Sequence, residues 1–137
     1  MVNENRKLIS TDESLPHDGS IVIVRSQDLN RRPTIKYSGA IYRGGAFRNF
    51  SGRSIDFVTH WVPAYNDETI FVDGDNYAFY KVVVIMENAF DEYKSELTES
   101  NPAPIEEKIM DRFWESLNGP FELPKEFDYL LDENEIK

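Results

Sequence analysis

Hydrophobic residues in the first half of the chain occur in short runs separated by turn-forming residues. The run Ile21–Val24 follows an Asp-Gly turn and is apolar at every position, which is typical of a strand buried on both faces. Residues 34–42, 46–50 and 57–62 form three further short runs, bounded by Gly, Asn, Ser or Pro. Runs of this length and spacing predict an antiparallel sheet.

The second half of the chain changes from strand-like to helical patterning. Residues 69–72 and 77–86 are apolar runs on either side of an Asp-Gly-Asp-Asn sequence, and we expect a hairpin there. From Glu87 onward the apolar positions follow a helical period, and residues 105–117 carry the clearest apolar stripe, ended by Gly-Pro. The sequence therefore predicts an α+β fold: an antiparallel sheet of about five or six short strands, followed by two or three C-terminal helices packed on it.

The composition favours a single folded core. Of the 137 residues, 40% are hydrophobic and 13% aromatic, which is too many for an intrinsically disordered chain. We expect a β-rich domain over residues 8–86 and an acidic helical extension over residues 87–137, packed on the same core. No apolar run reaches the ~18 residues of a membrane-spanning helix. We therefore expect a cytoplasmic protein with no membrane partner, as a monomer or homodimer.

The net charge of −10 lies entirely in the second half of the chain. Residues 1–86 carry 10 acidic and 10 basic side chains, whereas residues 87–137 carry 15 acidic and 5 basic ones. A field of this sign opposes nucleic acid and favours a partner with a basic surface. Seven carboxylates on and after the predicted helix are candidates for a partner-binding acidic face that imitates phosphates: Glu106, Glu107, Asp111, Glu115, Asp128, Asp132 and Glu133.

The segment 31–53 has the opposite character. It contains no acidic residue and interleaves Arg and Lys with aromatic residues and glycines, a combination that contacts phosphates and stacks bases in single-strand-binding proteins. The same pattern also fits strands with an aromatic core face and a basic solvent face. For the alternative of a nucleic-acid- or nucleotide-binding site, the candidate residues are Arg43, Arg48, Arg53, Tyr37 and Tyr42.

The residues that catalysis or metal binding would need are sparse. The chain has no cysteine and only two histidines, His17 and His60, and neither is spaced for a metal site. The glycine of the sequence at residues 73–76 comes too early for a calcium loop, and no Gly-Lys-Ser or Gly-Lys-Thr follows the Gly-Gly pair. The sequence therefore predicts no enzymatic activity, no cofactor and no metal.

Two segments resemble a family called domain of unknown function 551. Residues 8–19 read Leu-Ile-Ser-Thr-Asp-Glu-Ser-Leu-Pro-His-Asp-Gly before an apolar strand, and residues 58–63 read Val-Thr-His-Trp-Val-Pro. The family opens with Trp-Ile-Ser-Val-x-Glu-x-Leu-Pro-x-Asp-Gly and closes with Val-Thr-His-Trp-Met-Pro. The resemblance covers residues 8–64 and implies a small β-rich domain of phage or prophage origin, without a reaction. Leu8 departs from the family's Trp, and Ala64-Tyr65 departs from its closing Leu-Pro.

Together these features predict a non-enzymatic phage accessory protein that binds and inhibits a host protein in the host cytoplasm. In its sharpest form, the target is a nucleic-acid-handling defence complex, inhibited in the way that an anti-CRISPR protein acts, and the acidic face occupies a nucleic-acid channel. The alternative is a small nucleic-acid- or nucleotide-binding module that uses the basic-aromatic segment 31–53. Because the whole chain is strongly acidic, we do not expect nucleic acid as a partner.

Overall fold

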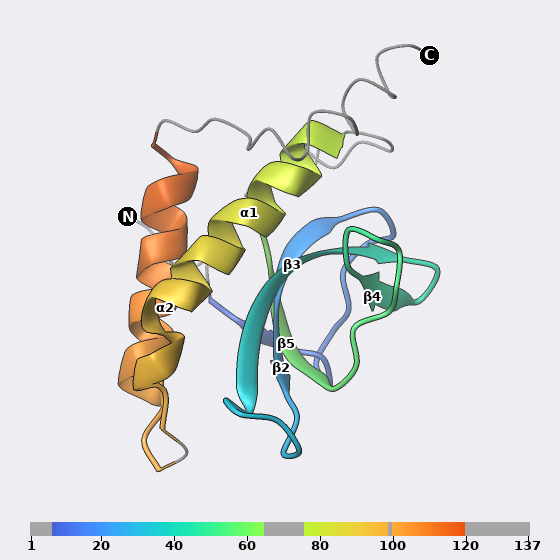
Figure 1. Cartoon of the computed structure of the whole chain (residues 1–137). Coiled ribbons are helices and arrows are strands. Elements are labelled where there is room, and N and C mark those ends of the chain that lie inside the picture. The colour runs from blue at the N-terminus through green and yellow to red at the C-terminus, as the bar shows by residue number, and fades with distance from the viewer. Residues whose placement is uncertain (1–6, 65–75, 99, 120–137) are drawn as a thin grey trace.

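A computed structural model describes residues 7–64, 76–98 and 100–119 (Figure 1). Five strands form one antiparallel sheet in the order β1-β5-β2-β3-β4, and the helices follow them in the chain. This arrangement confirms the predicted α+β fold. In chain order the elements are β1 (Ile9–Ser10), β2 (Ile21–Gln27), β3 (Ile35–Arg43), β4 (Ala46–Arg48), β5 (Val58–Pro63), α1 (Asn76–Tyr93), the 3-10 helix η3 (Lys94–Glu96) and α2 (Ala103–Leu117).

The central strand β2 is buried on both faces, as its sequence predicts. It pairs with β3 from Ile21↔Ile41 to Gln27↔Ile35 and with β5 on its other side. Successive side chains of a strand point to opposite faces. Ile21 and Ile23 therefore pack in the larger core under the helices, while Val22 and Val24 pack in a smaller core on the other face.

The smaller core is built around Trp61 of β5. Its ring packs with Val22, Val24 and Phe47 and is only 7% exposed. The indole N–H donates to the carbonyl of Ser14, at 2.9 Å, so the chain before β2 lies against this face of the sheet. Of the residues Ile21–Val24, Val22 and Val24 therefore share a core with Trp61, whereas Ile21 and Ile23 lie in the larger one.

The predicted hairpin over residues 77–86 is wrong, because these residues belong to α1. This helix packs against β3 on one side and α2 on the other (Figure 1), so it is buried around most of its circumference. A helix covered on two sides lacks the polar face by which an amphipathic helix is recognised, and its Val-Val-Val-Ile run is typical of strands. The other half of that hairpin, residues 69–72, lies outside the described residues. The domain boundary expected at residues 86–87 falls inside α1.

The two layers meet at Gly39 of β3, where the backbone of α1 comes unusually close. A Cβ atom at Gly39 would lie 2.9 Å from both the Cα and the backbone N of Val83. Backbone atoms of a packed helix cannot rotate away as the end of a side chain can. The absence of a side chain at this position therefore fixes how closely α1 approaches the sheet.

We expect Gly39→Ala to destabilise the protein by about 1–3 kcal/mol, the usual cost of overpacking a core, because α1 must move away from β3. The midpoint and slope of urea unfolding measure this change. Ser38→Ala is the matched control, because it alters the adjacent residue on the opposite face of β3. Equal stability of Gly39→Ala and the wild type would contradict the close approach.

Candidate functional site

A polar cluster joins the sheet to α2 and includes one of the predicted acidic-face residues. The Arg25 Nε–H donates to Glu106 Oε1 at 2.6 Å, and the Tyr37 hydroxyl donates to the same oxygen at 2.5 Å. A second guanidinium nitrogen of Arg25 donates to Thr59 Oγ1 at 2.7 Å. The side chains of Arg25 and Glu106 are only 14% and 16% exposed. Glu106 is therefore an internal contact of α2, whereas the sequence placed it among exposed carboxylates for a partner.

Tyr37 is part of the same cluster and is buried more deeply than Arg25 and Glu106. Burial, reinforced by the hydrogen bond and the charge of Glu106, raises the pKa of Tyr37 far above its ordinary value. The hydroxyl therefore stays protonated and keeps donating to Glu106 across the ordinary pH range. Because the residue is only 2% exposed, its ring offers no face to a base, which the predicted nucleic-acid-binding site would require of it.

The remaining acidic residues of α2 differ in how they are paired. Glu107 and Asp111 are exposed, and the structure pairs neither with a cation among the residues that it describes. Glu115 accepts from Arg112 at 3.0 Å, and Arg112 also donates to Glu92 at 3.1 Å. The other predicted members of the acidic face lie outside the described residues: Asp128, Asp132 and Glu133.

The other candidate residues of the basic segment make separate local contacts and do not form one common site. The Tyr42 ring packs edge-on against Phe47, with 4.9 Å between the ring centres. Arg48 donates through Nε to the carbonyl of Arg43 at 3.0 Å and through Nη1 to the carbonyl of Gly52 at 3.2 Å. Arg53 is exposed. Tyr42, Arg43, Arg48 and Arg53 do not line the cleft that lies beside β3, whereas Tyr37 is among its lining residues.

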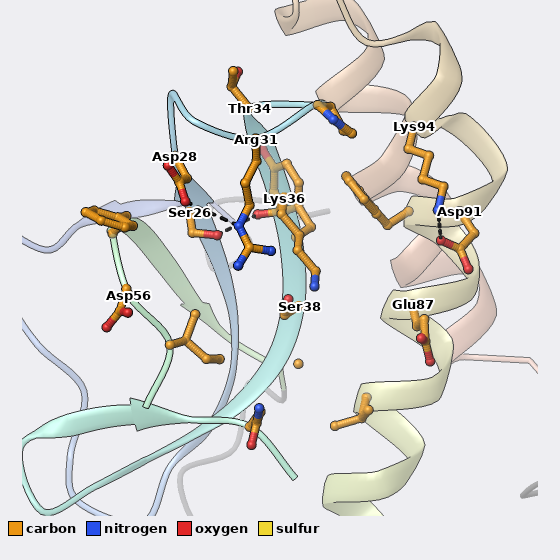
Figure 2. Close-up of a pocket in the computed structure, with 18 of the residues that line it drawn as sticks. Ser26, Asp28, Arg31, Thr34, Lys36, Ser38, Asp56, Glu87, Asp91 and Lys94 are labelled. Atoms are coloured by element: carbon orange, nitrogen blue, oxygen red, sulfur yellow. Dashed lines mark hydrogen bonds and ion pairs between the residues drawn. The ribbon is translucent and has the colours of Figure 1, made fainter. Parts of the chain in front are cut away.

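That cleft lies beside β3 and has a volume of about 640 Å³; we call it the β3 cleft (Figure 2). One side is formed by polar side chains of β2 and β3 and by the chain between β4 and β5. The other side is formed by α1. Its polar lining includes Ser26, Lys36, Ser38 and Asp56 on the strand side and Glu87, Asp91 and Lys94 on the helix side (Figure 2).

The charges around the β3 cleft balance. Four cations line it, namely Arg31, Arg32, Lys36 and Lys94, and so do four carboxylates, namely Asp28, Asp56, Glu87 and Asp91. Two pairs are already formed, Arg31 with Asp28 at 3.3 Å and Lys94 with Asp91 at 3.0 Å. Lys36, Asp56 and Glu87 form no ion pair with another residue of the described ranges. The cleft therefore presents free charges of both signs to a ligand.

Two exposed aromatic side chains also line the cleft. Phe50 is 47% exposed and Phe57 is 62% exposed. Phe57 has a backbone φ of 64°, a left-handed conformation that costs a residue with a side chain about 1–2 kcal/mol. The backbone N–H of Gln27 donates to its carbonyl at 3.1 Å and helps to hold this conformation. The sequence places Phe57 in a strand and contains no local signal of a positive φ, so sequence reasoning missed this residue.

Nothing in the described part of the chain has the geometry of a metal centre. No group of three or more His, Cys, Asp and Glu side chains there is arranged to hold a metal ion. The His60 Nδ1 atom lies 2.9 Å from Thr59 Oγ1, next to the cluster around Arg25. No described helix is long and apolar enough to cross a membrane.

Comparisons with protein-family models, with curated proteins and with solved structures find no match for this chain. The resemblance of residues 8–64 to domain of unknown function 551 is therefore a hypothesis that rests on the two motifs themselves. The two motif segments are neighbours in the fold, because β1 pairs with β5 at Ile9↔Trp61 and Ser10↔His60.

Proposed function

We propose that this protein is a non-enzymatic binding protein that attaches to a basic surface of a partner protein. The observation that carries the proposal is the pair Glu107 and Asp111, both exposed and unpaired with any described cation. Residues four apart lie on the same face of a helix, so the two carboxylates point the same way. A basic partner can therefore form ion pairs with both carboxylates, and no ion pair within the described residues has to break first.

The net charge of −10 supports the same proposal at longer range. Opposite charges on two proteins steer their encounter and raise the association rate, and this effect weakens as salt screens the charges. The resemblance to a phage and prophage family supports a finer form of the proposal. In that form the protein inhibits a nucleic-acid-handling complex of the host, and its carboxylates compete with phosphates for a basic channel.

The test reverses the two charges together, in Glu107→Lys/Asp111→Lys. Both residues are exposed, so the variant is expected to fold, because exposed charges contribute little to stability. Immobilised wild-type protein captures the partner from a bacterial lysate, and the partner is then purified. We expect the variant to associate with this partner about tenfold more slowly or worse, and we expect added salt to slow the wild type.

Asp12→Lys/Glu13→Lys is the matched control. It changes the net charge by the same amount at two exposed residues of the segment between β1 and β2, outside the helices. If both double variants bind the partner as the wild type does, the acidic face serves only solubility, and the proposed function is wrong. If both lose binding equally, net charge alone matters, and Glu107 and Asp111 are not the contact.

A further inference from the structure

The β3 cleft is a second binding surface that the proposed function does not use. None of its lining residues comes from α2, which carries Glu107 and Asp111. It brings exposed aromatic rings, an unpaired cation and side-chain hydroxyls together in one hollow of about 640 Å³. We propose that this cleft binds an extended segment of a partner polypeptide that carries an apolar side chain next to a carboxylate.

The apolar part of the proposed segment follows from the two exposed phenyl rings. Phe50 and Phe57 line the cleft with 47% and 62% of their surface exposed. Aromatic rings that are only partly covered gain most when an apolar partner removes them from water, and such residues dominate the energy of many protein interfaces. Phe57 has a left-handed backbone conformation that glycine would adopt more readily, yet the position carries an aromatic ring that lines the cleft.

The ammonium group of Lys36, unpaired among the described residues, is the reason for placing a carboxylate in the proposed peptide segment. This side chain projects from β3 on the same face as Ser38, and Ser26 of β2 lies beside it (Figure 2). Lys36 has no carboxylate partner in the described part of the chain, so its ammonium group is available to a ligand. Serine hydroxyls both donate and accept hydrogen bonds, which suits the alternating N–H and C=O groups of a polypeptide backbone.

The charge balance of the cleft argues for a polypeptide over a nucleic acid. A nucleic-acid strand brings a phosphate with every nucleotide, and those phosphates would meet Asp56, Glu87 and Asp91 as well as the cations. A polypeptide can place a single carboxylate at Lys36 and direct neutral or basic side chains toward the acidic positions. The chain's overall charge of −10 disfavours a polyanion further.

The test is selection of a displayed library of random short peptides on the intact protein. We expect the enriched peptides to share an apolar or aromatic residue beside Asp or Glu. Phe57→Gly should weaken the binding of a synthetic enriched peptide about tenfold or more, as loss of an interface aromatic does. Because glycine is unstrained at a φ of 64°, this variant is expected to keep its fold and its unfolding midpoint.

Charge-swapped variants supply the controls. Lys36→Glu should weaken the selected peptides and restore binding when the peptide's Asp or Glu is replaced by Lys. Arg53→Glu makes the same charge change on an exposed residue of the same basic segment that does not line the cleft, and it should leave binding unchanged.

Three results would overturn the proposal: no enriched peptide, enriched peptides that bind Phe57→Gly and Lys36→Glu as tightly as wild type, or displacement of the peptides by a single-stranded oligonucleotide. The last result would assign the cleft to nucleic acid. These outcomes are independent of Glu107 and Asp111, so they leave the proposed function of the acidic face untouched.

Discussion

Replacing Trp61 by alanine is expected to lower the free energy of unfolding by about 3–5 kcal/mol, the usual cost of deleting a buried tryptophan ring. Trp61 is 7% exposed and packs with Val22, Val24 and Phe47, so its loss leaves a cavity in the smaller core. It also leaves the Ser14 carbonyl without the indole N–H that donates to it. Equilibrium denaturation in urea, followed by circular dichroism, measures the change.

The variant Trp61→Phe separates the loss of packing in the core from the loss of the indole hydrogen bond. It keeps an aromatic ring in the core but removes the indole N–H, so we expect a smaller loss of stability than for alanine. A loss below about 1 kcal/mol for Trp61→Ala would contradict the burial of this ring and would make Trp61 a candidate binding residue.

Replacing Glu106 by alanine is expected to cost a similar amount, about 3–5 kcal/mol, because it leaves a charged partner poorly solvated. Arg25 and Tyr37 both donate to one oxygen of Glu106, at 2.6 and 2.5 Å. The Arg25 side chain, 14% exposed, keeps its positive charge in the variant but loses its carboxylate. The expected result is a lower unfolding midpoint and a weaker attachment of α2 to the sheet.

The double variant Arg25→Met/Glu106→Ala tests this explanation. Because it removes both charges, it should be more stable than the sum of the two single variants predicts, and a double-mutant cycle measures the difference. Glu107→Ala is the matched control. Glu107 is the adjacent residue of α2 and is exposed, so its replacement should change stability by no more than about 0.5 kcal/mol. Equal effects of Glu106→Ala and Glu107→Ala would contradict the internal role of Glu106.

The local sequence was sufficient to predict β2, β3, β4, β5 and the last helix, but not β1. The apolar run Ile21–Val24 became part of β2, and residues 34–42 correspond closely to β3. The apolar stripe over residues 105–117 corresponds to α2. These elements have either continuous burial or one clearly apolar face, and such patterns depend on the residues of the element alone.

The sequence misled where a helix is covered on two sides. Residues 77–86 are rich in β-branched and aromatic side chains, which favour strands locally. Packing between β3 and α2 outweighs that preference and makes them helical. The sequence of α1 alone does not identify β3 and α2 as the elements that cover it, because long-range packing brings them together.

The sequence by itself determined the charge of this protein, its acidic second half and the antiparallel sheet. Only the tertiary structure decided which charges are available. Glu106 and Glu107 are adjacent carboxylates in the same predicted helix, yet Glu106 meets Arg25 and Tyr37 of the sheet, whereas Glu107 is exposed. The β3 cleft likewise joins Lys36, Phe57 and Glu87 from three separate segments. Helical periodicity fixes the face of a helix to which a residue belongs, but the residues opposite it depend on long-range packing, which local patterns do not encode.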